Sequence, residues 1–112
     1  MKRGEVWLIN FDPTIGDELR KTRPAVIVSD DSVGVLALKV IVPITDWKDR
    51  YAIAPWMVHL TPNITNGLSK PSAADCFQVR SVSQQRFIRQ LGSLPDDVMR
   101  AVSDALAHVL SI

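Results

Sequence analysis

The sequence predicts a small, mainly β fold that ends in one α-helix. Roughly the first ninety residues consist of short β-branched or alternating segments separated by Pro, Gly, Asn and Asp. Helical spacing of apolar residues occurs only in the C-terminal segment. Several short strands followed by one helix favour a compact barrel with the helix packed on it.

The two N-terminal strands are predicted from different patterns. Residues 4–11 alternate between two faces with a period of two, which is typical of a strand. Residues 12–17 contain Pro13 and Gly16 and predict a loop. Residues 24–29 form a β-branched run that is apolar on both faces, as expected of a central barrel strand.

A third strand is predicted over residues 36–45, which are again rich in Val and Ile. Pro43 lies inside this segment and indicates an edge or a bulge near its end, because proline cannot donate to the ladder. Residues 46–55 are polar and predict a loop, and residues 62–67 predict a turn. The remaining strands are expected over residues 56–60, 73–79 and, as a short sixth strand, 88–91.

The C-terminal helix is predicted from its start signals and its apolar stripe. Ser93 is a candidate N-cap, Pro95 lies in the first turn, and Asp96 and Asp97 complement the helix dipole. The stripe at helical spacing consists of Val98, Val102, Ala105, Leu106 and Val109.

Length and composition predict a soluble, cytoplasmic domain. A chain of 112 residues with 46% hydrophobic residues can build its own core without disulfides or metal. Cys76 is the single cysteine, which excludes an internal disulfide framework and favours a reducing compartment. The N-terminus lacks the apolar run of a signal peptide. The longest apolar stretches, such as residues 40–44, are far shorter than the ~20 residues of a membrane span.

The net charge of +1 does not by itself indicate a nucleic-acid-binding protein, because dedicated binders usually have a clearly basic balance. The basic residues nevertheless form two clusters. One consists of Arg20, Lys21 and Arg23, and the other of Arg80, Arg86 and Arg89. The clusters are compatible with one local basic patch or with ordinary solvated surface charge.

Three segments occur in order along the chain. The first has Arg-Gly-Glu-Val-Trp at 3–7, Phe-Asp-Pro at 11–13, Gly16, and Lys-Thr-Arg-Pro-Ala-Val-Ile-Val-Ser at 21–29. The second is Val-Pro-Ile-Thr at 42–45, and the third is Gln-Val-Arg-Ser-Val at 78–82, followed by Gln-Arg-Phe at 85–87. In this order they resemble the MazF/PemK family of type II toxin–antitoxin endoribonuclease toxins.

The resemblance implies a CcdB/PemK-like fold, an SH3-like, partly open antiparallel β-barrel with the C-terminal helix packed on it. Residues 1–112 would then form a single toxin domain. Members of the family are homodimers that cut single-stranded RNA, including mRNA, at short sequences, which inhibits translation and growth. The products carry 2′,3′-cyclic phosphate and 5′-hydroxyl ends. The reaction needs no metal or other cofactor, and a cognate acidic antitoxin protein inhibits it.

Two residues match the catalytic positions of the family. Arg23 matches the catalytic arginine, and a guanidinium offers paired donors to phosphate oxygens while staying charged at working pH. We expect it to stabilise the transition state electrostatically rather than to transfer a proton. Thr45 matches the second position, from which its hydroxyl can donate to the scissile phosphate; as an ordinary residue at a strand end it would need no such role.

RNA contacts are expected from a loop and from the third segment. The candidates are Gly16, Asp17, Glu18, Arg20, Lys21, Phe77, Gln78 and Arg80. Gln78 matches a residue that lines the RNA groove in the family, and its amide can read base edges. Phe77 stands where the family usually has an acidic residue, so it puts a carried-over base preference in doubt while offering a surface for base stacking.

Other chemistries are less compatible with the sequence. His59 and His108 invite a paired acid–base mechanism, but a strand residue and a solvated helix residue are the simpler interpretations. Trp47 and Trp56 are open to base stacking or to packing. No grouping of His, Cys, Asp and Glu has the spacing of metal ligands.

Two other functions are compatible with the same fold. One is a CcdB-like toxin that binds gyrase without catalysis, but such toxins use a C-terminal tryptophan that this chain lacks. The other is an SH3-like interaction module. That interpretation predicts an aromatic peptide groove, which the single tyrosine Tyr51 hardly supplies.

Overall fold

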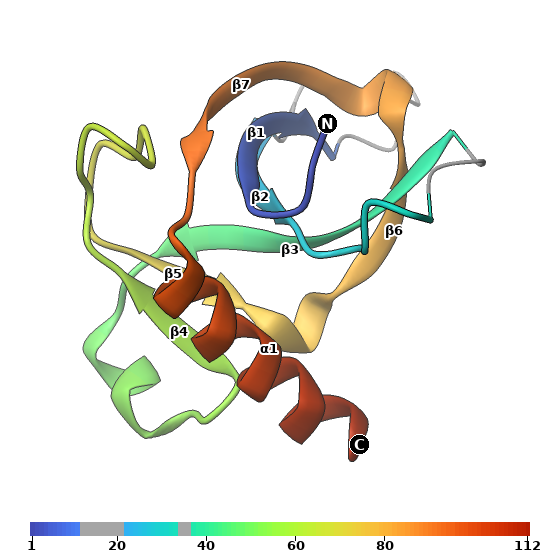
Figure 1. The fold of residues 1–112 in the computed structure, drawn as a ribbon. Coiled ribbons are helices and arrows are strands. Elements are labelled where there is room, and N and C mark those ends of the chain that lie inside the picture. Colours follow the sequence, from blue (N-terminus) through green and yellow to red (C-terminus); the bar gives the residue numbers. More distant parts are fainter. Residues whose placement is uncertain (12–21, 34–36) are drawn as a thin grey trace.

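The computed structural model describes residues 1–11, 22–33 and 37–112 (Figure 1). The strands are β1 (Glu5–Asn10), β2 (Thr22–Ile27), β3 (Leu38–Asp46), β4 (Met57–Leu60), β5 (Ser72–Asp75), β6 (Arg80–Ser83) and β7 (Phe87–Ser93). The helices are α1 (Asp96–Leu110) and the short 3-10 helices η1 (Asp49–Ile53), η2 (Cys76–Gln78) and η3 (Gln84–Arg86). No helix within the described ranges has the length and apolar character needed to cross a membrane.

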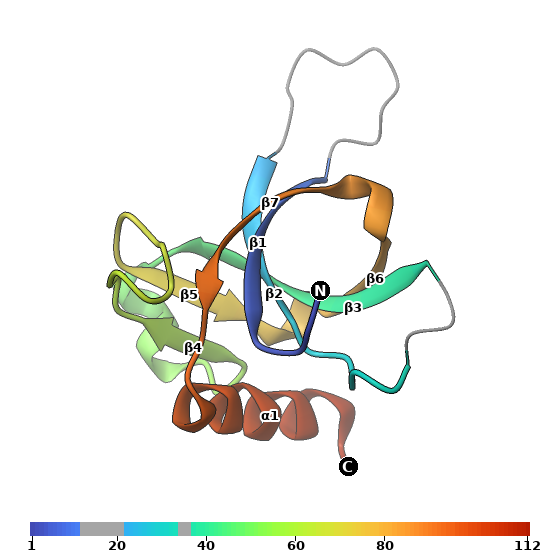
Figure 2. The same ribbon diagram turned by 45° about the horizontal axis from the view of Figure 1, so that its top comes forward.

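The strands form one bent antiparallel sheet with β3 at its centre. The order is β4-β5-β3-β2-β1-β7, and β6 also pairs with β3. The N-terminal half of β3 pairs with β2 and β6, and its C-terminal end pairs with β5. Figure 2 shows β1, β2, β3, β6 and β7 curving around a common interior, with α1 running beneath β4. The predicted barrel-like β fold with a C-terminal helix is confirmed.

The position of Pro43 differs from the prediction of an edge or bulge. The strand β3 has partners on both sides, and Pro43 itself is in register with Ala25 of β2. On the other side of β3, pairing with β6 ends at Ile41 and pairing with β5 begins at Ile44. Pro43 therefore lies where that second ladder is interrupted, a place where a residue without an N–H group is tolerated.

Apolar side chains are buried on both faces of β1, β2 and β3. One cluster faces α1 and includes Val6, Val26, Val42, Leu60, Met99, Val102 and Ala105. The other lies on the opposite face and consists of Ile9, Ala25, Ile27, Ile41 and Val82, with Trp7, Phe11 and Phe87 packed against it. The alternation of β1 and the two apolar faces of β2 are thereby confirmed. Each fully buried Val or Ile contributes about 1.5–3 kcal/mol, so these three strands form a stable platform.

The predicted strand at 73–79 is too long, and β6 was not predicted. The strand β5 ends at Asp75, because the Asp75 carboxylate accepts a hydrogen bond from Phe77 N and caps η2. The chain then resumes as β6 beside β3. Apolar residues (Cys76, Phe77 and Val79) continue through this segment, so the sequence pattern alone does not reveal the break. The last strand, β7, is longer than the predicted 88–91 because it follows β1 along its whole length.

The helix α1 is confirmed, but Ser93 is not its N-cap. Ser93 is the last residue of β7 and its N–H donates to Thr65 O at 2.9 Å, so Pro95 occupies the capping position. The acidic first turn is as predicted. The apolar stripe packs on the first cluster, with Met99 as an additional buried member.

Candidate active site

A cleft of about 520 Å³ opens where β2 and β3 separate. The two strands are paired from Ile27 and Ile41 as far as Ala25 and Pro43. Continuing this register by two residues would place Arg23 opposite Thr45. The β2–β3 pairing ends before them. Arg23 stays paired with β1 and Thr45 with β5, and the ends of both strands line the cleft.

Arg23 and Thr45 both line this cleft. Arg23 is exposed and is fixed on its backbone by its pairing with Ile9 of β1. Thr45 is half-buried and is paired with Ala73 of β5. The structure therefore brings together the two residues that the sequence predicts as catalytic, each on a strand rather than on a loop. Backbones held by neighbouring strands give such side chains a defined geometry.

Among the residues that the structure describes, three cations line the cleft, and two of them were not among the predicted site residues. Arg89 of β7 and Lys70 of the β4–β5 loop line it together with Arg23. Arg23 and Arg89 come from the two basic clusters of the sequence, so part of each cluster contributes to one positive surface. Asp46 is the carboxylate of this lining within the described part of the chain.

The ion pair at the rim of the cleft is weak. Lys70 Nζ lies 3.1 Å from Asp46 Oδ2, and both side chains are more than half exposed. Exposed pairs of this kind contribute about 0–1 kcal/mol. Lys70 is therefore readily available to a phosphate that enters the cleft. The hydroxyls of Thr22 and Ser69 also line the cleft and can act as neutral donors, whereas the Ser72 hydroxyl already donates to Lys70 O at 2.8 Å.

The β4–β5 loop, which forms one wall of the cleft, is held against β7 by a tight turn. Asn66 is 3% exposed; its side chain accepts from Asn63 N and Leu68 N and donates to Thr61 O. A Cβ atom on Gly92 of β7 would lie 2.2 Å from the carbonyl oxygen of the turn, so only glycine permits this approach. The sequence predicts the turn from its Asn and Gly residues, but not its docking on β7.

The other predicted RNA-binding residues divide into two groups. Gly16, Asp17, Glu18, Arg20 and Lys21 lie outside the described residues. Phe77, Gln78 and Arg80 are described and exposed, but they belong to η2 and β6 and do not line the cleft.

This second surface has its own interactions. The Gln78 amide Nε2 donates to Asp75 Oδ2 at 2.9 Å, and the Phe77 ring lies 6.1 Å from that of Trp56. The Arg80 guanidinium lies 5.0 Å from the centre of the Phe11 ring, at cation–π distance.

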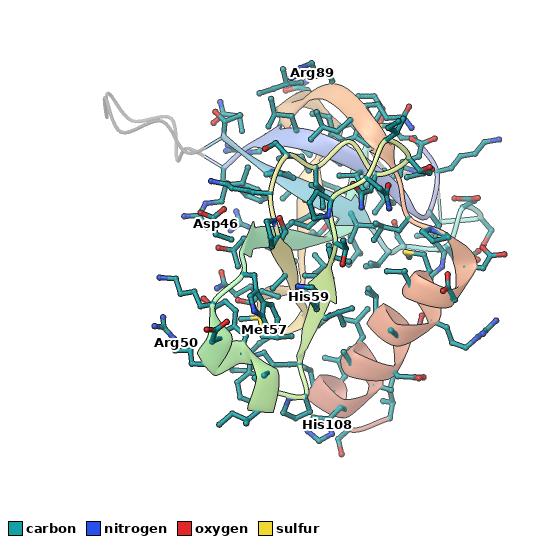
Figure 3. The ribbon with its side chains drawn as sticks, turned by 90° about the vertical axis from the view of Figure 1, so that its left-hand side faces the viewer. Asp46, Arg50, Met57, His59, Arg89 and His108 are labelled. Atoms are coloured by element: carbon teal, nitrogen blue, oxygen red, sulfur yellow. The ribbon has the colours of Figure 1, made fainter. Side chains whose placement is uncertain are left out.

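The two histidines do not form a pair. His59 is an exposed residue of β4 whose ring packs edge-on against Trp47, with the centroids 4.5 Å apart. His108 lies in the last turn of α1, and Figure 3 shows it at the opposite end of the molecule from Arg89. The structure thus supports the simpler interpretation of both residues, and it packs Trp47 between His59 and Tyr51.

Cys76 is unsuited to nucleophilic chemistry. It is fully buried against the helix, with Sγ 3.9 Å from Val102 O. Burial, with a smaller contribution from the charge of Asp75, raises the pKa of the Cys76 thiol to about 12. A neutral thiol is a poor nucleophile and a poor metal ligand. Among the described residues, His, Cys, Asp and Glu form no group of three or more that could hold a metal ion.

The family model and the curated relatives that match the sequence belong to one family. Residues 2–110 match the family model described as PemK-like, MazF-like toxin of type II toxin–antitoxin system. The chain is 31% identical to endoribonuclease MazF9 of Mycobacterium tuberculosis over 112 residues, which cover 95% of this chain and 92% of MazF9. It is 32% identical to endoribonuclease PemK of Escherichia coli over 113 residues, which cover 99% and 83% of the two chains.

Structural comparison agrees with this. In a crystal structure of MazE-MazF from Deinococcus radiodurans, the matching chain is 27% identical and superposes with a TM-score of 0.80. The match covers 100% of this chain and 96% of that one.

Proposed function

Because the chain belongs to the family of PemK-like, MazF-like toxins of type II toxin–antitoxin systems, we propose that it cuts single-stranded RNA at short sequences without a metal ion. The observation that carries this proposal is the meeting of Arg23 and Thr45 in the cleft between β2 and β3. We further propose that the toxin domain spans residues 1–112 and acts on mRNA in the cytoplasm, where cleavage inhibits translation and growth.

The proposed reaction is an internal transesterification. The ribose O2′ attacks the adjacent phosphorus, and the bond from phosphorus to O5′ of the next nucleotide breaks. The products are a 2′,3′-cyclic phosphate and a 5′-hydroxyl. In the net reaction, one proton leaves O2′ and one proton is added to the departing O5′. Negative charge increases on the non-bridging oxygens in the transition state, so the site must supply positive charge and hydrogen-bond donors there.

Arg23 and Thr45 supply these groups. The guanidinium is permanently charged and donates two parallel hydrogen bonds to phosphate oxygens. The Thr45 hydroxyl donates a third hydrogen bond from the opposite wall of the cleft. Arg89 and Lys70 then hold flanking phosphates, which positions the strand without reading its sequence.

A cognate antitoxin is the second proposed partner. A toxin of the same family is found with the antitoxin MazE in the Deinococcus radiodurans structure. We propose that an acidic segment of the antitoxin covers the RNA groove of a toxin homodimer, because the cations of the cleft attract carboxylates as they attract phosphates. Full cleavage activity of the antitoxin-bound protein would exclude this mode of inhibition.

The gyrase-binding alternative is not favoured. The family match and the two endoribonuclease relatives point to RNA cleavage. A long single-stranded RNA should be cut by the purified protein in EDTA, and the new ends should be a 2′,3′-cyclic phosphate and a 5′-hydroxyl. Intact RNA, together with direct binding of gyrase, would replace the proposal with the alternative.

A further inference from the structure

A buried carboxylate lies directly behind the exposed amide of Gln78. Asp75 is the last residue of β5 and is only 8% exposed. Its Oδ1 accepts from Phe77 N at 3.2 Å, and its Oδ2 accepts from Gln78 Nε2 at 2.9 Å. A buried carboxylate is costly unless hydrogen bonds satisfy it, and these two donors do so. Asp75 thus links the backbone of η2 to the side chain of Gln78.

The chemistry of this contact fixes the direction of the Gln78 amide. An ionised carboxylate only accepts hydrogen bonds, so the amide must present its NH₂ group to Asp75. Its carbonyl oxygen Oε1 then points away from Asp75. Gln78 is exposed, and across residues 1–11, 22–33 and 37–112 no protein donor binds Oε1. The exposed amide therefore offers a fixed acceptor to a ligand.

Aromatic surface adjoins this acceptor. Phe77, the neighbour of Gln78 in η2, is 70% exposed. The ring of Trp56, which is 36% exposed, lies 6.1 Å from it at an interplanar angle of 52°. Exposed aromatic faces stack with unpaired bases, and a polar group at their side can read a base edge. A single-stranded base is the ligand that fits both features.

We propose that Asp75 is a positioning residue for sequence recognition, because it fixes Gln78 with Oε1 outward so that this surface accepts a base through one of its N–H groups. The inference rests on the proposed ribonuclease function. It specifies which residue sets the polarity of one recognition position, that is, whether this position offers the base a hydrogen-bond acceptor or a donor. Neither Asp75 nor Gln78 lines the cleft that contains Arg23 and Thr45. Exchanging the outward acceptor for a donor should therefore alter which RNA sequences are cut, without removing the groups proposed to break the bond.

Asp75→Asn tests this polarity directly. The variant keeps the shape of the side chain, and its carbonyl oxygen can still accept from Phe77 N. Its NH₂ group then faces Gln78, whose amide must turn over to accept this hydrogen bond. The turned amide presents NH₂ outward, so the subsite should prefer a base acceptor in place of a base donor.

The double variant Asp75→Asn with Gln78→Glu is the matched rescue. The amide that the first substitution introduces donates to one oxygen of the new carboxylate, and the other oxygen points outward as an acceptor. Gln78→Glu alone places two carboxylates at hydrogen-bond distance and should lose the fixed arrangement. The second substitution restores the original base preference only if that preference depends on an acceptor at residue 78.

The experiment is cleavage of a random-sequence single-stranded RNA pool in EDTA, with sequencing of the fragments that begin at the new 5′-hydroxyl ends. We expect Asp75→Asn to change base preference at one position by about tenfold, the effect of one hydrogen bond to an otherwise unpaired polar group. The preference at the other positions should stay, and the double variant should restore the original base. Thermal unfolding of each variant verifies that it is folded.

The possible outcomes separate this inference from the proposed function. If wild type cuts the pool and folded Asp75→Asn keeps every base preference, the inference is wrong and the ribonuclease function stands. The same holds if the double variant fails to restore the original preference. If wild type cuts no RNA, the proposed function fails and the inference fails with it.

Discussion

The side chains of Arg23 and Thr45 reach the same cleft because the β2–β3 ladder ends just before them. Each backbone is held by a different neighbour, β1 for Arg23 and β5 for Thr45. At the scale of single residues, the site therefore depends on where one pair of strands stops being paired. Arg89 and Lys70 add charge from two further elements.

Arg89→Ala should weaken RNA binding without changing the bases that are recognised. Removing one phosphate contact on single-stranded RNA lowers the slope of log affinity against log salt by about 0.7. The measurement is a binding titration at several salt concentrations in an Arg23→Ala background, so that the RNA stays intact. Arg100→Ala is the matched control, because Arg100 is exposed on α1 and does not line the cleft. Equal salt slopes for the two variants would contradict this role of Arg89.

Cys76 makes a prediction about stability at high pH. The pKa of its thiol is raised from 9.0 to about 12 in the folded protein, mainly by burial. Between these two values the unfolded chain releases the proton and the folded chain keeps it, so the free energy of unfolding must fall as pH rises from 9 toward 12. Below that range both states hold the proton, and the effect is absent.

Comparison of wild type with Cys76→Ala isolates this effect from the titration of lysines and tyrosine. We expect the difference in the free energy of unfolding between the two proteins to be constant below about pH 9 and to shrink above it. Denaturant unfolding between about pH 8 and pH 11 measures it. A difference that does not change across this range would show that the thiol is not protected in the folded state.

At the scale of elements, the docking of the β4–β5 turn on β7 keeps one wall of the cleft in place. Gly92→Ala puts a Cβ atom 2.2 Å from Thr65 O and forces the two backbones apart. We expect a loss of about 1–3 kcal/mol in stability, the usual cost of overpacking, and lower cleavage activity because Ser69 and Lys70 move with the turn.

Thermal unfolding measures this loss, with Gln90→Ala as the control on the same strand. Gln90 is exposed, and its Nε2 donates only a 3.2 Å hydrogen bond to Gly92 O, so its substitution should change stability by less than about 0.5 kcal/mol. For a domain of this size, 1 kcal/mol corresponds to a shift in Tm of roughly 4–8 °C. An unchanged Tm for Gly92→Ala would mean that the turn is not held as described.

The strands and the helix can be predicted from the sequence where the local periodicity of apolar residues determines the element. Residues of β1, β2 and α1 alternate or recur as predicted because each of these elements buries regular faces. Prediction fails where a side chain overrides the pattern. Asp75 ends β5 and starts η2, and the hydrogen bond from Ser93 N to Thr65 O keeps Ser93 in β7. Local periodicity cannot predict such hydrogen bonds, because it describes the residues one segment at a time.

At the scale of the whole molecule, the resemblance to toxin ribonucleases predicts the fold and the pair Arg23 and Thr45. It does not predict that Arg89 and Lys70 join them. These residues come from β7 and the β4–β5 loop, and only the folding of the bent sheet brings them to the cleft. Phe77 and Gln78, which the resemblance predicts as RNA-binding residues, lie on η2, outside the lining of the cleft.

The central claim is that Arg23 and Thr45 form the catalytic centre of a metal-independent ribonuclease. The most direct measurement is the rate of cleavage of a long single-stranded RNA in EDTA by wild type, Arg23→Ala and Thr45→Ala, each shown to be folded. We predict sequence-restricted cleavage by wild type and a loss of about two to three decades in rate for Arg23→Ala, the usual effect of removing one such donor. Thr45→Ala should also be impaired. Equal rates for wild type and both folded variants would contradict the assignment of this site.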